Sequence, residues 1–183
     1  MKSQPNITFE ESDTLISIVG LGSNLDSRNG SKFEIISKAI NSLEELSSRP
    51  IIISSFYESE PEFCPSDSPI FVNLVAVLFL PVNAKPMWFF RCVQKLEKRL
   101  GRVRSRGINK PRPIDIDLLF FGKKSISSDY LTIPHPRAVK RRFVLEPLAE
   151  IAPDLILPGQ EFSVTELLSR LPNNGWVRKF QAT

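Results

Sequence analysis

Two aspartates, Asp115 and Asp117, interrupt an apolar run in the stretch RPIDIDLLFFG, which covers residues 112–122. Side chains alternate along a β-strand, so both carboxylates face one side while the apolar residues between them face a core. Two carboxylates roughly 7 Å apart on one face repel each other, and a hard divalent cation removes that repulsion. Mg²⁺ is commonly held by one or two carboxylates together with phosphate oxygens and water. The pattern therefore indicates a magnesium site. The plainer alternative is a solvent-facing strand end whose acids pair with arginines.

A basic loop runs directly into this strand. Residues 95–112 carry eight Lys or Arg and one acid, Glu97, and residues 135–142 add four basic residues, whereas the remainder has 12 basic and 19 acidic residues. Positive charge gathered in two short segments suits a nucleotide polyphosphate better than a nucleic acid, which usually contacts a broad basic face. Arginine forks beside metal-binding carboxylates are what phosphoryl transfer requires, because that chemistry is mostly positioning and charge stabilisation. The loop arginines best placed for this are Arg102, Arg104 and Arg112.

Other motifs in the chain narrow the choice of chemistry. The GLGSNL motif at residues 20–25 lacks the third glycine of G-x-G-x-x-G and any following G-K-[ST], so neither a Rossmann site nor a P-loop is supported. We expect Gly20 and Gly22 to let the chain turn at a strand end. Two cysteines and one histidine are too few for a Cys/His zinc site. Two lone thiols suit a reducing cytoplasm.

Hydrophobic periodicity predicts the elements that position these residues. Strands are predicted at residues 14–22, 51–59, 70–80 and 114–121, and helices at 31–46 and 83–100. This order predicts an α+β fold with a ferredoxin-like β-α-β-β-α-β core and an antiparallel sheet. Shorter C-terminal additions are predicted around residues 131–137, 143–151, 163–171 and 176–180.

Length and composition fit one domain. We expect residues 14–183 to form it, after a loose, polar N-terminal extension of residues 1–13 that has neither signal-peptide nor transit-peptide character. The sequence has no run of 18 apolar residues, so no membrane span is expected. A cytoplasmic protein is therefore predicted.

Seven stretches together resemble a known enzyme family. In chain order they are GLGSNL, SSFYESEP, FVNLV, LEKRLGRVR, KPRPIDIDLLFFG, IPHPR and RRFVLEPLAEIAPDL, covering about residues 15–160. They are similar to the 6-hydroxymethyl-7,8-dihydropterin pyrophosphokinases of folate biosynthesis, and the pair PRPIDID and IPHPR is the specific part. The resemblance implies transfer of pyrophosphate from ATP to the hydroxymethyl oxygen of the pterin, with release of AMP and with two Mg²⁺ ions as cofactors.

The resemblance also implies a role for individual residues. The implied catalytic residues are Arg102, Arg112, Asp115 and Asp117, the two aspartates being the metal ligands as well. The implied ATP contacts are Glu97, Arg104, Leu118, His135 and Arg141. The implied pterin pocket consists of Ser59, Pro61, Glu62, Phe71, Asn73 and Phe143. No general base is assigned, although Asp117 is a candidate.

The residue types agree with part of this assignment. Phe71 and Asn73 lie two apart on one predicted strand, so an aromatic ring and an amide face the same side, and an amide offers both a donor and an acceptor to a heterocycle. The alternatives are that Phe71 and Phe143 are core residues and that His135 is a turn residue. Arg137, Lys140 and Arg142 are interpreted as a solvated helix face outside the site.

The chain departs from the family pattern at three places that bear on the pocket. Asn109 stands where many members have a tryptophan, and Glu62 stands at a position that is often apolar. Many members also have a glycine early in the loop at residues 61–69, where this chain reads PEFCPSDSP. These departures concern the packing of a lid and the affinity for substrate rather than the reaction.

The implied partners are ATP and hydroxymethyldihydropterin, with no nucleic acid and no membrane. A monomer is expected, and an association with dihydropteroate synthase is left open. Two other functions are compatible with parts of the sequence. An RNA-binding module is disfavoured because two acids lie where the sheet would meet RNA and the strands lack RNP-like aromatics. The other is one half of a bifunctional folate enzyme.

Overall fold

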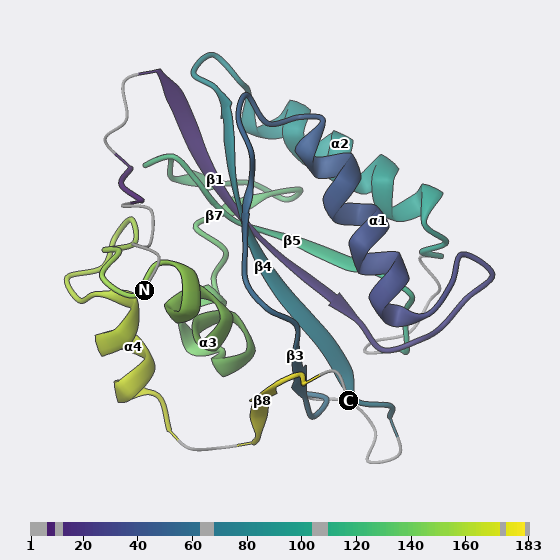
Figure 1. The fold of residues 1–183 in the computed structure, drawn as a ribbon. Helices are drawn as coiled ribbons and strands as arrows, with labels where there is room; N and C mark the ends of the chain where they lie inside the picture. The colour runs from purple at the N-terminus through teal and green to yellow at the C-terminus, as the bar shows by residue number, and fades with distance from the viewer. Residues whose placement is uncertain (1–6, 10–12, 63–67, 104–109, 173–174, 182–183) are drawn as a thin grey trace.

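The centre of the molecule is an antiparallel sheet with strand order β5-β1-β4-β3-β8, and the short strand β2 also pairs with β4 (Figure 1). The computed structural model describes residues 7–9, 13–62, 68–103, 110–172 and 175–181. The strands of this sheet are β1 (Thr14–Ser23), β2 (Ile52–Ile53), β3 (Tyr57–Ser59), β4 (Phe71–Pro81), β5 (Asp115–Phe121) and β8 (Val177–Lys179). A separate two-stranded sheet is formed by β6 (Ile126–Ser127) and β7 (Thr132–Ile133).

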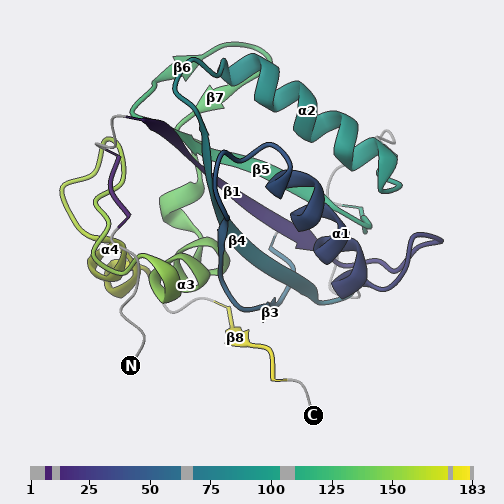
Figure 2. The same cartoon turned by 45° about the horizontal axis from the view of Figure 1, so that its top comes forward.

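Helices cover both faces of the large sheet (Figures 1 and 2). One face carries α1 (Lys32–Glu44) and α2 (Pro86–Arg99), and the other carries α3 (Arg142–Ile151) and α4 (Val164–Arg170), with the short 3-10 helix η1 (Ala138–Lys140) before α3. Alternate residues of β4 enter two separate cores: Leu74 and Leu78 pack with α1 and α2, whereas Val75 and Val77 pack with α3 and α4. Burial on both faces explains why the central strands read as nearly continuous apolar runs.

The predicted order of the first elements is confirmed, as are the α+β class and the antiparallel pairing. The assignment to the ferredoxin-like group stays a prediction. The single strand predicted at residues 51–59 is wrong in detail, because it is divided into β2 and β3. Between them, the Ser54 hydroxyl accepts a hydrogen bond from the Val75 amide at 3.1 Å, and the Ser55 amide and hydroxyl donate to the Glu150 carboxylate at 2.9 and 2.7 Å. The Ser54 amide still donates to the Val75 carbonyl at 3.0 Å, so the side-chain bonds of Ser54 and Ser55 supplement the backbone pairing at the break.

The start of α1 follows from a local signal in the sequence. Ser31 caps the helix by accepting from the Glu34 amide, and the Glu34 carboxylate accepts in return from the Ser31 amide. This reciprocal pair satisfies amides that have no partner within the helix. The helix therefore begins at Lys32, one residue after the predicted start.

Part of the predicted N-terminal extension packs on the body of the protein. Ile7 is 7% exposed within the core beneath α3 and α4, and the Phe9 ring lies 6.5 Å from the Phe120 ring. For these residues the expectation of a loose extension is wrong, because their apolar side chains anchor the segment; residues 1–6 and 10–12 lie outside the described residues. Within the described ranges, no helix combines the length and apolar character that crossing a membrane requires.

Candidate active site

A pocket of about 300 Å³ lies over one end of the sheet, on the face that carries α3. Its floor is formed by Gly20 and Gly22 of β1. In the strand register Gly22 lies between Asp115 of β5 and Asn73 of β4, and Gly20 lies between Asp117 and Val75. On this face of the sheet, β1 therefore has no side chain at Gly20 and Gly22, between the aspartates of β5 and Asn73 of β4.

The predicted role of these two glycines is wrong. Strand β1 continues through both of them to Ser23, and neither has the positive φ of a turn glycine. A β-carbon at Gly22 would lie 3.4 Å from the Asn73 side-chain oxygen, which is close to ordinary contact. The glycines therefore keep the pocket floor open rather than turn the chain.

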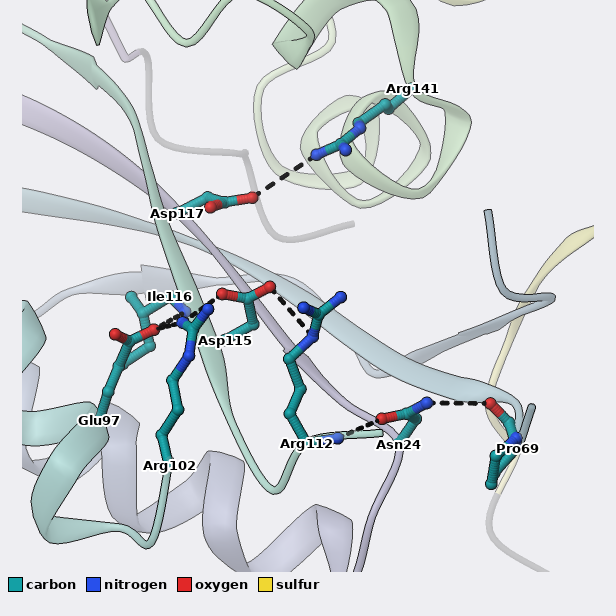
Figure 3. A network of polar contacts seen from close by, with 9 residues as sticks. All are labelled: Asn24, Pro69, Glu97, Arg102, Arg112, Asp115, Ile116, Asp117 and Arg141. Carbon is teal, nitrogen blue, oxygen red and sulfur yellow. Dashed lines mark hydrogen bonds and ion pairs between the residues drawn. The ribbon is translucent and has the colours of Figure 1, made fainter. Parts of the chain in front are cut away.

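Asp115 and Asp117 face this pocket from one side of β5, as predicted (Figure 3). Asp115 accepts from Arg102 and forms an ion pair with Arg112, whose Nε lies 3.2 Å from the carboxylate. Asp117 lies 3.5 Å from Arg141. Burial raises the pKa of Asp117, and the neighbouring Asp115 raises it further. Keeping both carboxylates ionised is therefore costly, and an added cation would lower that cost.

Glu97, near the end of α2, holds the strand and one arginine together. Its side chain accepts a hydrogen bond from the Ile116 amide at 2.8 Å and another from Arg102, and the residue is only 3% exposed (Figure 3). Burial raises the pKa of Glu97, whereas Arg102 and the Ile116 amide lower it. Ile116 lies between the two aspartates, so the bond from its amide to Glu97 positions the acid pair. The bond from Arg102 to Glu97 positions this arginine as well. Beyond Arg102, Glu97 lines a second cavity of about 740 Å³ rather than the main pocket.

Replacement of Glu97 by alanine is expected to lower the free energy of unfolding by about 2–4 kcal/mol, because the Ile116 amide loses its partner and Arg102 loses one of its two carboxylate partners. Glu97→Gln should lose less, since its amide oxygen can still accept from Ile116. Urea denaturation of both variants measures the difference. Equal losses in the two variants would show that the backbone bond carries none of the effect.

Asn24, which the sequence analysis did not select, ties three loops together beneath the pocket. Its amide donates to the Arg112 carbonyl at 3.2 Å, its side-chain oxygen accepts from the Arg112 amide at 2.8 Å, and its Nδ2 donates to the Pro69 carbonyl at 3.3 Å (Figure 3). The residue is 2% exposed. In the sequence, the feature that could have identified Asn24 is a polar amide directly after a predicted strand of glycine and apolar residues.

Two arginines present unused donors in the pocket. The Nε atoms of Arg112 and Arg141 are buried, and although they lie 3.2 Å from the Asp115 carboxylate and 3.5 Å from the Glu62 carboxylate, neither makes a hydrogen bond. Each guanidinium lies over an aromatic ring, Arg112 at 5.6 Å from the centre of Phe71 and Arg141 at 5.1 Å from the centre of Phe143. Buried guanidinium groups with donors to spare are suited to a ligand with several anionic oxygens.

The wall of the pocket also carries polar and aromatic groups. Asn73 Nδ2 donates to the buried Ser59 hydroxyl at 2.9 Å, which fixes the orientation of the amide. Phe71 and Phe143 are partly buried and both line the pocket. The wall can therefore hold a flat ring against aromatic surfaces and meet a polar edge with an oriented amide.

His135 lies beside Asp117 at the start of the turn that precedes η1. Its amide donates to the Leu119 carbonyl at 2.9 Å, and its Nδ1 accepts from the Arg137 amide at 3.2 Å. Burial lowers the pKa of His135, although Asp117 opposes this shift. A neutral ring whose Nδ1 accepts carries its proton on Nε2, so His135 can donate one hydrogen bond from that atom.

The structure brings most of the predicted site residues into one pocket. The predicted residues that line it are Ser59, Glu62, Phe71, Asn73, Arg102, Arg112, Asp115, Asp117, Arg141 and Phe143. Pro61 is the neighbour of two lining residues, Glu60 and Glu62. The side chain of Leu118 is not brought to the pocket, because it packs in the core beneath α1 and α2.

Two further groups of predictions have different outcomes. Arg137, interpreted as part of a solvated face outside the site, is exposed as expected but also lines the pocket, so only its exclusion from the site is wrong. Arg142 pairs with Glu146 along α3 at 2.7 Å, and Lys140 is exposed, as expected of a solvated face. Arg104 and Asn109 lie outside the described residues, as does Cys64, whereas Cys92 is a free thiol on α2.

Comparison with known proteins gives a consistent result. The model of the family described as 7,8-dihydro-6-hydroxymethylpterin-pyrophosphokinase (HPPK) matches residues 18–153. The 2-amino-4-hydroxy-6-hydroxymethyldihydropteridine pyrophosphokinases of Haemophilus influenzae and Pseudomonas aeruginosa are 35% and 39% identical over 87% of this chain, which spans 95% and 94% of theirs. The folic acid synthesis protein fol1 of Pneumocystis carinii is 36% identical over 84% of this chain. This chain spans only 20% of that relative.

A likeness to solved structures concerns the fold alone. The crystal structure of wild-type Plasmodium falciparum HPPK-DHPS has a TM-score of 0.66 and 18% identity to this chain. The match covers 88% of this chain and 45% of that one.

Proposed function

The chain belongs to the 7,8-dihydro-6-hydroxymethylpterin-pyrophosphokinase family, and on this basis we propose that it transfers pyrophosphate from ATP to 6-hydroxymethyl-7,8-dihydropterin. The products are the pterin diphosphate and AMP, and the reaction belongs to folate synthesis. One observation supports this function above the others: the acid pair and the buried arginines with unused donors share one pocket with an oriented amide and two aromatic rings. A nucleotide and a heterocycle would thus meet in a single space.

The two halves of the pocket suit the two substrates. Phe71, Phe143 and Asn73 would hold the pterin, because its flat ring can stack on aromatic faces and its mixed donor and acceptor edge can pair with an amide. Arg102, Arg112 and Arg141 would bind the phosphates, because guanidinium forks match phosphate oxygens. His135 adds a donor beside Asp117.

Magnesium dependence is also proposed, with Asp115 and Asp117 as the protein ligands of two ions. Their carboxylates share one face of β5, and burial together with the charge of Asp115 raises the pKa of Asp117. Within the part of the chain that the structure describes, no group of three or more His, Cys, Asp or Glu side chains could hold a metal by itself. This donor set fits ions that are shared with substrate phosphates. When bound, the ions would neutralise charge on the oxygens that flank the transferred group.

The transfer itself is an in-line displacement. The hydroxymethyl oxygen of the pterin forms a bond to the β-phosphorus of ATP, while the bond from that phosphorus to the oxygen bridging the α-phosphate breaks and AMP leaves. The protein contributes position and charge: the aromatic rings and Asn73 orient the hydroxyl, and Arg102 and Arg112 stabilise the phosphoryl oxygens. The proton of the hydroxyl is lost in this step, and Asp117 is a candidate acceptor.

Three further properties are proposed. The sheet is of the ferredoxin-like, split β-α-β type, which is supported by the position of β4 between β1 and β3 and antiparallel to both. The free thiol of Cys92 suits the reducing cytoplasm. The protein acts as a monomer; a partner of the DHPS kind stays open, because the Plasmodium falciparum structure is named as HPPK-DHPS.

The nucleotide product distinguishes this function from other uses of ATP. Purified protein with ATP, Mg²⁺ and 6-hydroxymethyl-7,8-dihydropterin should form AMP and the pterin diphosphate in equal amounts, and AMP should not form when the pterin is omitted. Chromatography of the nucleotides and pterins measures both products. Formation of ADP, or AMP formation independent of the pterin, would be inconsistent with pyrophosphate transfer.

Gly22→Ala is expected to reduce activity while leaving the fold stable. The added β-carbon comes no closer than 3.4 Å to a neighbouring atom, so we expect the free energy of unfolding to change by less than about 1 kcal/mol. The methyl group would occupy the floor beside Asn73, and the KM for the pterin should rise about ten-fold, which is a loss of about 1.4 kcal/mol of binding. Steady-state kinetics and thermal unfolding test the two parts; an unchanged KM would contradict the role of the open floor.

A further inference from the structure

Arg141 lies near two carboxylates, those of Asp117 and Glu62. Each carboxylate is close to a different nitrogen of the guanidinium. Arg141 Nε lies 3.5 Å from Glu62, and Nη1 lies 3.5 Å from Asp117. The Arg141 side chain is 12% exposed, whereas that of Glu62 is 37% exposed. The positive charge of Arg137 also attracts the Glu62 carboxylate. Arg141, the proposed phosphate ligand, is therefore held between two carboxylates, one of which lies in the strand and the other at the rim of the pocket.

The contact between Arg141 and Glu62 neutralises charge without satisfying the guanidinium. Charge-assisted hydrogen bonds between nitrogen and a carboxylate are about 2.7–2.9 Å long, and Arg141 Nε, although buried, makes no hydrogen bond. The donor therefore remains available for a closer anionic oxygen. A polyphosphate that took this position would bring further negative charge near Glu62, and like charges at such a distance repel each other.

We infer that Glu62 is an internal competitor of the nucleotide polyphosphate for Arg141. This inference rests on the proposed function. In the protein without ligand the Glu62 carboxylate offsets the charge of Arg141, and it must release Arg141 when the phosphates bind. Asp117 cannot move away in the same manner, because it belongs to the paired strand β5. Glu62 is therefore a positioning residue that weakens nucleotide binding and returns to Arg141 when the nucleotide leaves.

The test measures the Kd of α,β-methylene-ATP with Mg²⁺ by calorimetry at low salt. In this analogue the bond that breaks during transfer is replaced by a stable one. Glu62→Gln keeps the size of the side chain and removes its charge, so its Kd should fall about two- to five-fold, as expected for one partly exposed ion pair. The gain should shrink at high salt because of screening. Damage to the fold would instead weaken binding.

Two further variants assign the effect. Glu44→Gln removes the same charge from an exposed position on α1, on the opposite face of the sheet, and should leave the Kd unchanged. In an Arg141→Met background, Glu62→Gln should give a clearly smaller gain in affinity, because only the direct repulsion between Glu62 and the phosphates is left to relieve.

Each alternative result overturns the inference. An unchanged or higher Kd in Glu62→Gln, an equal gain in Glu44→Gln, or an undiminished gain in the Arg141→Met background would each exclude competition for Arg141. Wild-type protein that binds no analogue would overturn the proposed function as well, so the two failures are distinguishable.

Discussion

Replacement of Asp117 by asparagine is expected to reduce kcat for pterin-dependent AMP formation by about 100-fold or more, without loss of stability. Removal of one strong electrostatic group from a preorganised site typically costs about 3 kcal/mol of transition-state stabilisation. The same substitution should not lower the free energy of unfolding and is expected to raise it. An acid whose pKa is raised by folding destabilises the folded state at any pH above its pKa in the unfolded chain, and burial raises the pKa of Asp117. Asparagine removes this cost.

Kinetics at saturating Mg·ATP and pterin, with thermal unfolding at neutral pH, measure both effects. Asp129→Asn is the matched control, because Asp129 is exposed in the turn between β6 and β7; its kcat should equal that of the wild type. Near-normal turnover of Asp117→Asn would rule out a role for Asp117 in the reaction. A large fall in Tm together with lost activity would indicate a structural role instead.

Arg112→Ala is expected to lower kcat by about 100-fold with a much smaller change in the affinity for ATP. Arg112 pairs with Asp115, lies over the Phe71 ring and keeps a buried Nε without a hydrogen bond. Its backbone is fixed on both sides by Asn24, so the guanidinium is positioned before a substrate arrives. A preorganised donor aimed at developing charge contributes more to the transition state than to the ground state.

Comparison of kcat, KM and the Kd of α,β-methylene-ATP separates these contributions. Arg112→Lys should recover only part of the activity, because an ammonium group lacks the planar fork of a guanidinium. Arg99→Ala, which removes an exposed guanidinium on α2 that donates to Ser42, is the matched control. A raised KM with unchanged kcat in Arg112→Ala would show that Arg112 binds the ground state and the transition state equally.

Features that depend on local periodicity could be predicted from the sequence. The alternation in residues 114–121 is enough to place Asp115 and Asp117 on one face of a strand, and the same reasoning places Phe71 with Asn73. The burial of the central strands on both faces also follows from their long apolar runs. The resemblance to a family supplied the residues that the chain brings in from distant segments, such as Arg141 and Phe143.

Features that depend on contacts between distant segments could not be predicted. Asn24 and Arg112 are 88 residues apart in the sequence, and only the folded chain shows that Asn24 makes hydrogen bonds to both the amide and the carbonyl of Arg112. Glu97 was selected as an ATP contact, but its bond to the Ile116 amide needs the register of α2 against β5. The glycines of β1 resemble turn glycines until the neighbouring strands show that they form the floor. Arg137 is an exposed residue, as the sequence suggests, but only the fold shows that the turn before η1 places it at the pocket.

A crystal structure with Mn²⁺ and α,β-methylene-ATP would show whether Asp115 and Asp117 hold metal ions on the nucleotide, because Mn²⁺ replaces Mg²⁺ and is located by its anomalous scattering. We expect metal peaks between the phosphate oxygens and the carboxylates of Asp115 and Asp117, with Arg112 and Arg141 on the phosphates. Bound nucleotide whose metal and phosphates lay away from both aspartates would contradict this expectation.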